Sequence, residues 1–291
     1  MTLAHVVRRP GMKPEVTLLD SFALEKSETE GLQRLKSARQ LKSYRCTTLM
    51  AEGEYNISQF DAPPVPREER KEALRWSLRD VVNYPVESAC IDVLDVPGDG
   101  LPGRAASVLV VSAAERAVRA RAVPFEEARV ALEAVDVPEL AQRNVAALLE
   151  AENRGLVFLR LDESGIMLTL SYRGELVAVR RGEINTRQIL ADDPEQSARV
   201  RERLVLELQR SLDNFDRQYS HIPVSKVVLA AHPLVEGLAA ELAANVYVPV
   251  QELDLATVID FPNVPDLRDT ACQARNLLAI GAALRTDEGA A

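Results

Sequence analysis

The sequence has few of the residue types from which metal and redox sites are built. It contains three histidines and three cysteines among 291 residues. His5, His221 and His232 lie far apart and show no spacing typical of metal ligands. The cysteines are odd in number and include no C-x-x-C pair, so we expect reduced thiols in a cytosolic protein. The sequence therefore predicts neither a metal site nor a disulfide framework.

The sequence also lacks an excess of positive charge and a long apolar run. Asp and Glu outnumber Lys and Arg by 44 to 35, which gives a net charge of −9. This balance argues against nucleic acid as a partner, because phosphate binding needs a basic surface. No segment approaches the roughly 18 apolar residues of a membrane-spanning helix, and no apolar core of a signal peptide comes after Arg8 and Arg9. Any membrane role is therefore expected to depend on a partner protein.

Common catalytic motifs are missing as well. There is no G-x-x-x-x-G-K-[ST] loop, no G-x-G-x-x-G after a strand and no G-x-S-x-G elbow. Gly100 and Gly103 supply the glycines of a phosphate loop, but neither Lys nor Ser or Thr comes after them. We interpret this stretch as a surface loop, and no motif nominates a catalytic residue.

The hydrophobic pattern that is present predicts an α/β protein with two lobes. Alternating apolar residues predict strands, and apolar residues at helical spacing predict helices between them. The second half starts anew with its own strands, so we expect a boundary near residues 153–155. The pattern predicts hairpins at 4–19 and 44–60, helices at 67–83, 125–134, 136–150, 194–219 and 269–285, and three strands within 156–180.

Four colinear segments are informative together: EALRWSLRDVVNYPVESACID at 72–92, AVDVPELAQRN at 134–144, GELVAVRRGEI at 174–184 and LAIGAALR at 278–285. They resemble the PilM family of pilus-assembly proteins, and most closely its mannose-sensitive haemagglutinin branch, MshI. The resemblance implies an actin-like ATPase fold of the ribonuclease H-like class, with an inserted subdomain as in FtsA. It places a first lobe at 1–152 with the subdomain at about 43–118, a second lobe at 153–285 and a disordered tail at 286–291.

The resemblance also implies partners. A PilM-like protein is cytoplasmic and is recruited to the inner membrane by the N-terminal peptide of a PilN-like or MshJ-like protein. There it links the assembly platform to the pilus motor, and a homo-oligomer is compatible with this role. The tail peptide is apolar and basic in the family, which suits an acidic protein. We expect its groove in the first lobe near the inserted subdomain, although the sequence does not specify the groove's side chains.

The nucleotide motifs depart from the family pattern. The chain begins in sequence that resembles the segment after the first phosphate hairpin, so that hairpin is expected to be missing. In the second hairpin, Arg160 stands at the position of an acidic residue and Asp162 at that of a glycine. A carboxylate repels phosphate, and a side chain blocks the close approach of backbone. Ala231 and His232 stand where the family has two glycines on the adenine side of the nucleotide site, so their side chains fill space that a nucleotide would need.

These departures favour a non-catalytic scaffold with a vestigial nucleotide site at Asp162, Ser164, Gly165 and His232. Two alternatives stay open. One is a working ATPase that binds ATP and Mg²⁺, in which the turn at 162–165 forms a phosphate nest. The other is the cytoplasmic domain of a secretion-system L protein, which requires a transmembrane helix after it, whereas the sequence ends in TDEGAA.

Overall fold

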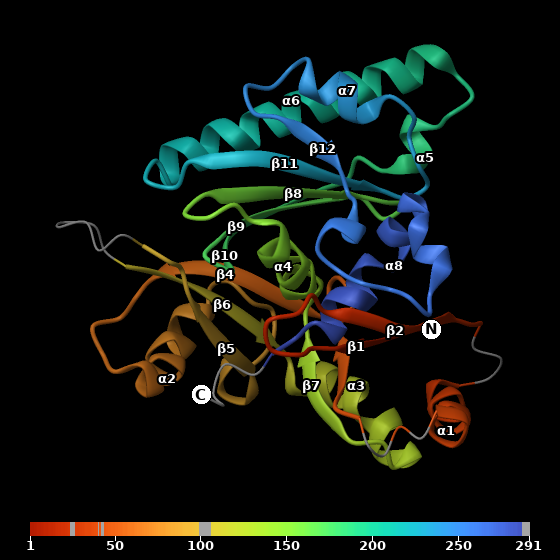
Figure 1. Ribbon diagram of the computed structural model, residues 1–291. Coiled ribbons are helices and arrows are strands. Elements are labelled where there is room, and N and C mark those ends of the chain that lie inside the picture. The colour runs from red at the N-terminus through yellow and green to blue at the C-terminus, as the bar shows by residue number, and fades with distance from the viewer. Residues whose placement is uncertain (24–26, 40, 42–43, 99–105, 287–291) are drawn as a thin grey trace. The chain divides into compact units, whose positions relative to one another are not determined.

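The computed structural model describes residues 1–23, 27–39, 41, 44–98 and 106–286 (Figure 1). The chain forms two compact units: unit 1 holds Met1 and the chain from Ser21 to Pro138, and unit 2 holds residues 2–20 and the chain from Glu139 onward. This grouping differs from a division at residue 153, because the N-terminal strands and the helix that ends at Leu149 pack with the C-terminal half. The assignment of actin-like lobes and of a subdomain at 43–118 stays a prediction. The loop predicted at 100–103 and the tail from residue 287 lie outside the described residues.

Unit 2 is built on a five-stranded sheet with the strand order β10-β9-β8-β11-β12. β8, β9 and β10 pair antiparallel, whereas β11 pairs in parallel with both β8 and β12. The three strands predicted within residues 156–180 are confirmed. The strands of the sheet are β8 (Gly155–Leu161), β9 (Ile166–Tyr172), β10 (Glu175–Gly182), β11 (Val224–Ala231) and β12 (Val250–Glu252).

Helices cover both faces of this sheet. The longest, α6, lies across one face (Figure 1) and buries a stripe that includes Leu204, Leu208 and Leu212, each fully buried. Asp193 starts α6 by accepting a hydrogen bond from the backbone N–H of Glu195 at 3.0 Å, as an N-cap residue does. The predicted long helix is therefore confirmed. The helices of unit 2 are α4 (Pro138–Leu149), α5 (Thr186–Ile189), α6 (Pro194–Gln218), α7 (Leu238–Ala243) and α8 (Thr270–Ala283).

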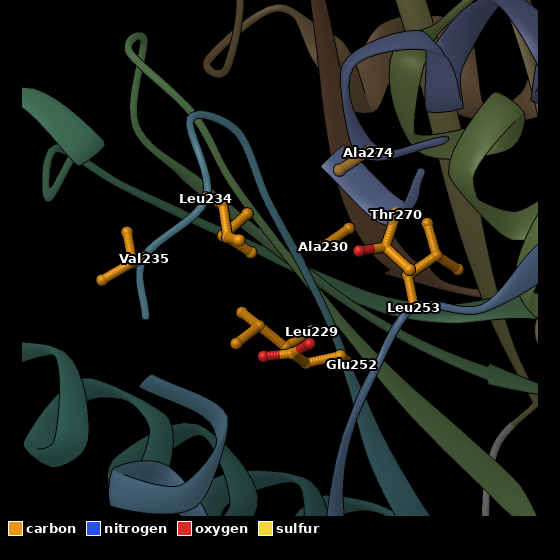
Figure 2. A pocket seen from close by; sticks show the side chains of 9 residues that line it. Leu229, Ala230, Leu234, Val235, Glu252, Leu253, Thr270 and Ala274 are labelled. Atoms are coloured by element: carbon orange, nitrogen blue, oxygen red, sulfur yellow. The ribbon is translucent and has the colours of Figure 1, made fainter. Parts of the chain in front are cut away.

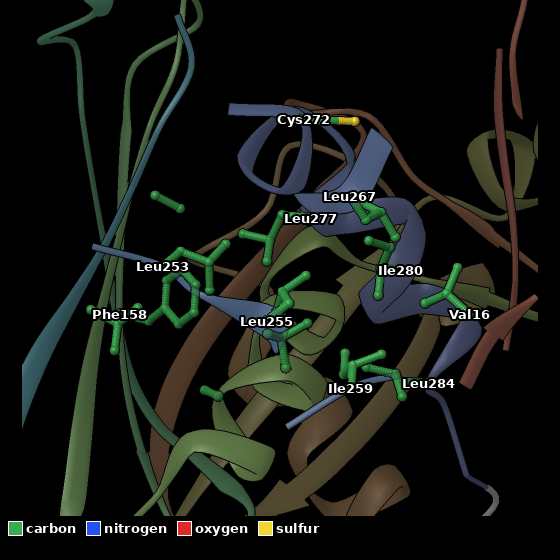
Figure 3. Close-up of a cluster of buried hydrophobic side chains, with 14 of the residues drawn as sticks. Val16, Phe158, Leu253, Leu255, Ile259, Leu267, Cys272, Leu277, Ile280 and Leu284 are labelled. Atoms are coloured by element: carbon green, nitrogen blue, oxygen red, sulfur yellow. The ribbon is translucent and has the colours of Figure 1, made fainter. Parts of the chain in front are cut away.

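The other face of the sheet packs on α4 and α8, and this contact forms the main core of unit 2 (Figure 3). Phe158 of β8 and Ala230 of β11 both point into it. α4 and α8 touch backbone to backbone, because a Cβ on Gly281 would lie only 2.0 Å from the carbonyl oxygen of Ala141. Asn144 fixes the same crossing by donating from Nδ2 to the Gly281 carbonyl at 2.9 Å. A side chain at Gly281 would force the two helices apart.

The N-terminal strands β1 (Thr2–Val7) and β2 (Glu15–Ser21) pair as predicted and belong to unit 2. Val16 is fully buried in the core, and its N–H donates to the carbonyl of Asp260 at 2.7 Å. The Arg8 guanidinium donates to the Leu284 carbonyl at 2.6 Å. These long-range contacts explain why the hairpin groups with the C-terminal half of the chain.

Unit 1 contains a three-stranded antiparallel sheet in the order β4-β6-β5 and a parallel pair, β3-β7. The hairpin predicted at 44–60 is wrong: β3 pairs with β7 and β4 pairs with β6, because partners distant in sequence satisfy their backbones. β6 is the central strand of the three-stranded sheet, and its residues Val108, Leu109 and Val110 are buried. The strands are β3 (Cys46–Leu49), β4 (Tyr55–Asp61), β5 (Cys90–Asp95), β6 (Ser107–Ala113) and β7 (Leu132–Asp136).

Two predicted helices of unit 1 are corrected. The segment 67–83 is a 3₁₀ turn (Arg67–Glu69), the short helix α2 (Arg70–Arg75) and a second 3₁₀ turn (Trp76–Leu78), so only part of it is α-helical. The segment 125–134 divides between α3 (Glu115–Ala128) and β7, because Arg129 ends the helix in a left-handed conformation with φ of 54°. α1 (Glu28–Arg39) begins after Ser27, whose Oγ accepts from the N–H of Glu30 at 3.2 Å.

Candidate functional site

The candidate site lies at the carboxyl ends of β8 and β11, the edge at which ligands bind in open α/β sheets. Leu161 ends β8 opposite Ala231, which ends β11. The N–H of His232 donates to the Leu161 carbonyl at 2.9 Å and extends the pairing by one residue. Parallel pairing therefore brings His232 beside Asp162, although the two are far apart in the sequence.

Donor groups in and beside the turn from Asp162 to Gly165 bind the Asp162 carboxylate. Asp162 Oδ1 accepts hydrogen bonds from the backbone N–H of Ser164 at 2.8 Å and from the Ser164 hydroxyl. Asp162 Oδ2 forms an ion pair with the guanidinium of Arg160. Both carboxylate oxygens therefore bind groups of the same hairpin. The turn donates an N–H to an anion, as a phosphate nest does, but that anion belongs to the chain itself.

The backbone of the turn is held independently of these side chains. The N–H of Asp162 donates to the Gly165 carbonyl at 3.0 Å. The carbonyl of Asp162 accepts a hydrogen bond from the N–H of Thr186, also at 3.0 Å. Gly165 has φ of +149°, and a Cβ there would lie 2.4 Å from the carbonyl oxygen of Gly182 on β10. Only glycine permits this contact between the turn and the neighbouring strand.

Thr186 is a residue of the site that sequence reasoning missed. It is fully buried, and its hydroxyl lies 3.4 Å from the His232 carbonyl, so it joins the two strand ends. The local signal was Asn185 with Gln188 three residues later, which form a capping box that starts α5. That signal indicates a helix start, but only the folded chain shows that this start lies beside Asp162.

Buried polar atoms without partners surround the edge. Among the described residues, neither Nε of Arg160 nor Nδ1 of His232 has a hydrogen-bond partner. Arg160 stands opposite Ala230 in the β8–β11 register, so its side chain leaves the sheet on the face that also carries Phe158. The positively charged guanidinium of Arg160 therefore lies at the margin of the apolar core, at this edge of the sheet.

A shallow hollow borders the end of β11 (Figure 2). It encloses only about 10 Å³, about the space of one water molecule. Its walls are mostly aliphatic, with the Glu252 carboxylate and the Thr270 hydroxyl as polar groups. The lining residues are Leu229, Ala230, Ala231, Leu234, Val235, Glu252, Leu253, Thr270 and Ala274.

A second charged group of unit 2 is also satisfied internally. Glu139, in the first turn of α4, has a side chain only 2% exposed. Its Oε1 accepts hydrogen bonds from Nε and Nη2 of Arg181 at 2.9 and 2.6 Å. The buried Glu139 carboxylate therefore forms an ion pair with Arg181, which lies at the end of β10 next to Gly182.

The surface of unit 1 carries an exposed aromatic residue. Trp76 is 55% exposed, and the guanidinium carbon of Arg79 lies 5.0 Å from the centre of its ring, within the range of a cation–π contact. Leu78 lies between them in sequence and is fully buried, so it anchors this turn in the small core of the unit. Trp76 is the single tryptophan of the chain.

Neither a metal cluster nor a membrane-spanning helix is found in the part of the chain that the structure describes. Within those residues, no three His, Cys, Asp or Glu side chains are arranged to hold a metal ion. None of the described helices is long and apolar enough to span a membrane.

No family model and no curated protein matches the sequence. Among solved structures, a chain described as "PilM-PilN type IV pilus biogenesis complex" is similar, with a TM-score of 0.77, 18% identity, and coverage of 97% of this chain and 94% of that one. The cytoplasmic domain of EpsL, from the type II secretion system of Vibrio cholerae, gives a TM-score of 0.45 at 11% identity, with 94% of each chain covered. A Bacteroides thetaiotaomicron protein with an actin-like ATPase fold and unknown function gives 0.43 at 11% identity, covering 94% of this chain and 95% of that one.

The likeness at TM-score 0.77 spans nearly the whole of both chains and shows the fold. The predicted actin-like α/β fold is thereby confirmed. The two weaker likenesses add nothing to this conclusion. Because the sequences are only 18% identical, the likeness to the chain of the PilM-PilN complex shows the fold alone.

Proposed function

We propose that this protein is a PilM-like scaffold of type IV pilus biogenesis, of the mannose-sensitive haemagglutinin type. In this role it binds the N-terminal peptide of a PilN-like inner-membrane protein and is held by it at the cytoplasmic face of the membrane. The observation that carries the proposal is the likeness to a chain of the PilM-PilN complex, which covers 97% of this chain and 94% of that one. A match of both lengths is what a common assembly role predicts.

The charge of the chain supports a basic peptide as ligand. A net charge of −9 attracts a basic tail and raises the rate of encounter. Unit 1 also presents Trp76 at its surface, and aromatic residues are enriched where proteins bind one another. We place the peptide on unit 1.

The proposal is tested by titrating the full-length chain with a synthetic PilN-like tail peptide, followed by calorimetry and by the fluorescence of Trp76. We expect saturable binding, a change in Trp76 emission, and slower amide exchange in unit 1 when the peptide is present. A peptide of the same composition in scrambled order is the matched control. Equal binding of both peptides, or no binding, contradicts the scaffold role; protection confined to unit 2 contradicts only the placement.

We further propose that the nucleotide site is degenerate and that the protein does not hydrolyse ATP. Two features support this: Asp162 fills the turn with its own carboxylate, and the hollow beside Ala231 is small. Calorimetry with ATP and Mg²⁺ on the full-length chain tests it, and no binding in the micromolar range is expected. Micromolar binding would instead support the alternative of a working ATPase.

A further inference from the structure

The turn at 162–165 carries its own anion at the edge where a ligand would bind. We propose that the Asp162 carboxylate occupies the position of a ligand anion, so that the anion-binding donors of the turn are filled without any phosphate bound. The inference deepens the proposed loss of nucleotide binding and rests on it. It assigns a role to Asp162 that differs from simple repulsion of phosphate.

The donors around the carboxylate are those of a phosphate site. Asp162 collects a backbone N–H, a hydroxyl and a guanidinium, from Ser164 and Arg160. These are the three kinds of donor that bind phosphate oxygens in proteins. The carboxylate is itself largely buried, with its side chain 21% exposed. Such a carboxylate supplies the negative charge that the Arg160 guanidinium, 17% exposed, needs in this environment.

The frame of the turn does not depend on the carboxylate. The bonds from Asp162 N to Gly165 O and from Thr186 N to Asp162 O join backbone atoms only. The close contact between Gly165 and Gly182 is likewise a property of the backbone. A shorter, neutral side chain at position 162 therefore leaves the frame in place and frees the three donors.

Arg160 has spare donor capacity, and the neighbouring carboxylate is already paired. Nε of Arg160 is buried and has no acceptor among the described residues, so Arg160 can donate to more than the Asp162 carboxylate. The adjacent carboxylate, Glu163, is paired with Arg187, and both side chains are more than half exposed. Glu163 therefore does not take the place of Asp162 when that carboxylate is removed.

The experiment compares binding of inorganic phosphate to the wild-type chain, Asp162→Ala and Glu163→Ala, each checked for folding by circular dichroism. Glu163→Ala is the matched control, since it removes one negative charge from the same turn and frees none of the three donors. We expect phosphate to bind Asp162→Ala in the millimolar range and to bind the other two at least about ten-fold more weakly. Adding Arg160→Met to Asp162→Ala should abolish the gain.

A second measurement tracks amide exchange of Ser164. In Asp162→Ala its N–H should exchange at least about ten-fold faster than in the wild type, and saturating phosphate should restore the protection. Phosphate binding equally to all three proteins overturns the inference, and so does a folded Asp162→Ala that neither binds phosphate nor exchanges faster. Either result leaves the peptide titration unaffected, whereas tight ATP binding by the wild type would count against the proposed function.

Discussion

The two units build α/β structure in different ways, and their sheets show the difference. Along β8 and β9 nearly every side chain is buried, because helices cover both faces of the five-stranded sheet. Along β4 only Tyr55 is buried, and along β5 half-buried residues are interspersed with exposed ones. The core of that sheet is a small cluster that α2 and the turn after it cover, built on Leu74, Leu78, Val86, Val108 and Val110. Unit 2 therefore holds the larger share of the hydrophobic stabilisation.

The largest effect is expected from matched phenylalanine truncations in the two cores. Phe158 is fully buried in the main core of unit 2, whereas Phe60 lies at the margin of the small cluster in unit 1. Phe158→Ala should lower the free energy of unfolding by about 3–5 kcal/mol through lost burial and a cavity. Phe60→Ala should cost about half as much or less. Urea unfolding monitored by circular dichroism measures both, and equal costs would contradict the difference between the cores.

A smaller effect is expected from two glutamates that bind arginine. Glu139 is 2% exposed and binds Arg181, whereas Glu54 is 32% exposed and binds Arg121. Glu139→Gln leaves a guanidinium without its buried partner and should cost about 2–3 kcal/mol. Glu54→Gln should cost about 1 kcal/mol or less, since solvent screens an exposed pair. Unfolding free energies of both variants decide the comparison, and a larger loss for Glu54→Gln would reverse it.

Acid should affect the two units in different pH ranges. Burial lowers the pKa of His5, in the N-terminal hairpin of unit 2. Its contribution to stability is present above about pH 6.5 and is lost as the pH falls through the lowered value. The hydrogen bond from Arg121 lowers the pKa of Glu54 in unit 1, so that contribution is present above about pH 4.3 and is lost below it.

The measurement is the unfolding free energy at about pH 7.5, 5.5 and 3.5 for the wild type, His5→Gln and Glu54→Gln. His5→Gln should flatten the change over the upper interval, and Glu54→Gln should flatten part of the change over the lower one. Each effect is expected to be about 1 kcal/mol or less, and identical profiles for all three proteins would contradict the assignment.

The smallest effect is expected at the exposed aromatic residue of unit 1. Trp76→Phe removes a side chain that is 55% exposed and touches Arg79, so stability should change by no more than about 0.5 kcal/mol. Circular dichroism monitors unfolding here, because the variant has no tryptophan. A loss as large as that of Phe158→Ala would show that Trp76 is part of a core.

Unit 2 was more predictable from sequence than unit 1 for a physical reason. The strands within 156–180 are linked by short turns, and α6 carries a regular apolar stripe, so local pattern is enough to place them. β3 instead pairs in parallel with β7, and β4 pairs with β6 across a long connection. Such pairings leave no short-range signal, and the hairpin expected at 44–60 was wrong for that reason. Likewise α3 ends at Arg129 in a left-handed conformation, although arginine is not a residue type that marks helix ends.

The candidate site divides in the same way. The order Asp162, Ser164, Gly165 in a tight turn was readable, because an aspartate that accepts from the N–H two residues on is a local arrangement. The substitutions at the glycine positions were also readable, and they raised the question of lost nucleotide binding. The grouping of His232 with this turn came from the family resemblance. The place of Thr186 beside the turn was not readable, since separate segments must first be aligned by the sheet.

The sequence by itself determined the α/β class, the strands and turns around Asp162, and the acidic balance that suits a basic peptide. These depend on residue type and short-range spacing. Only the tertiary structure decided that the N-terminal strands belong with the C-terminal half, and that Thr186 lies beside Asp162. Those outcomes depend on long-range backbone pairing and on which buried donors find an acceptor, and neither is encoded in neighbouring residues alone.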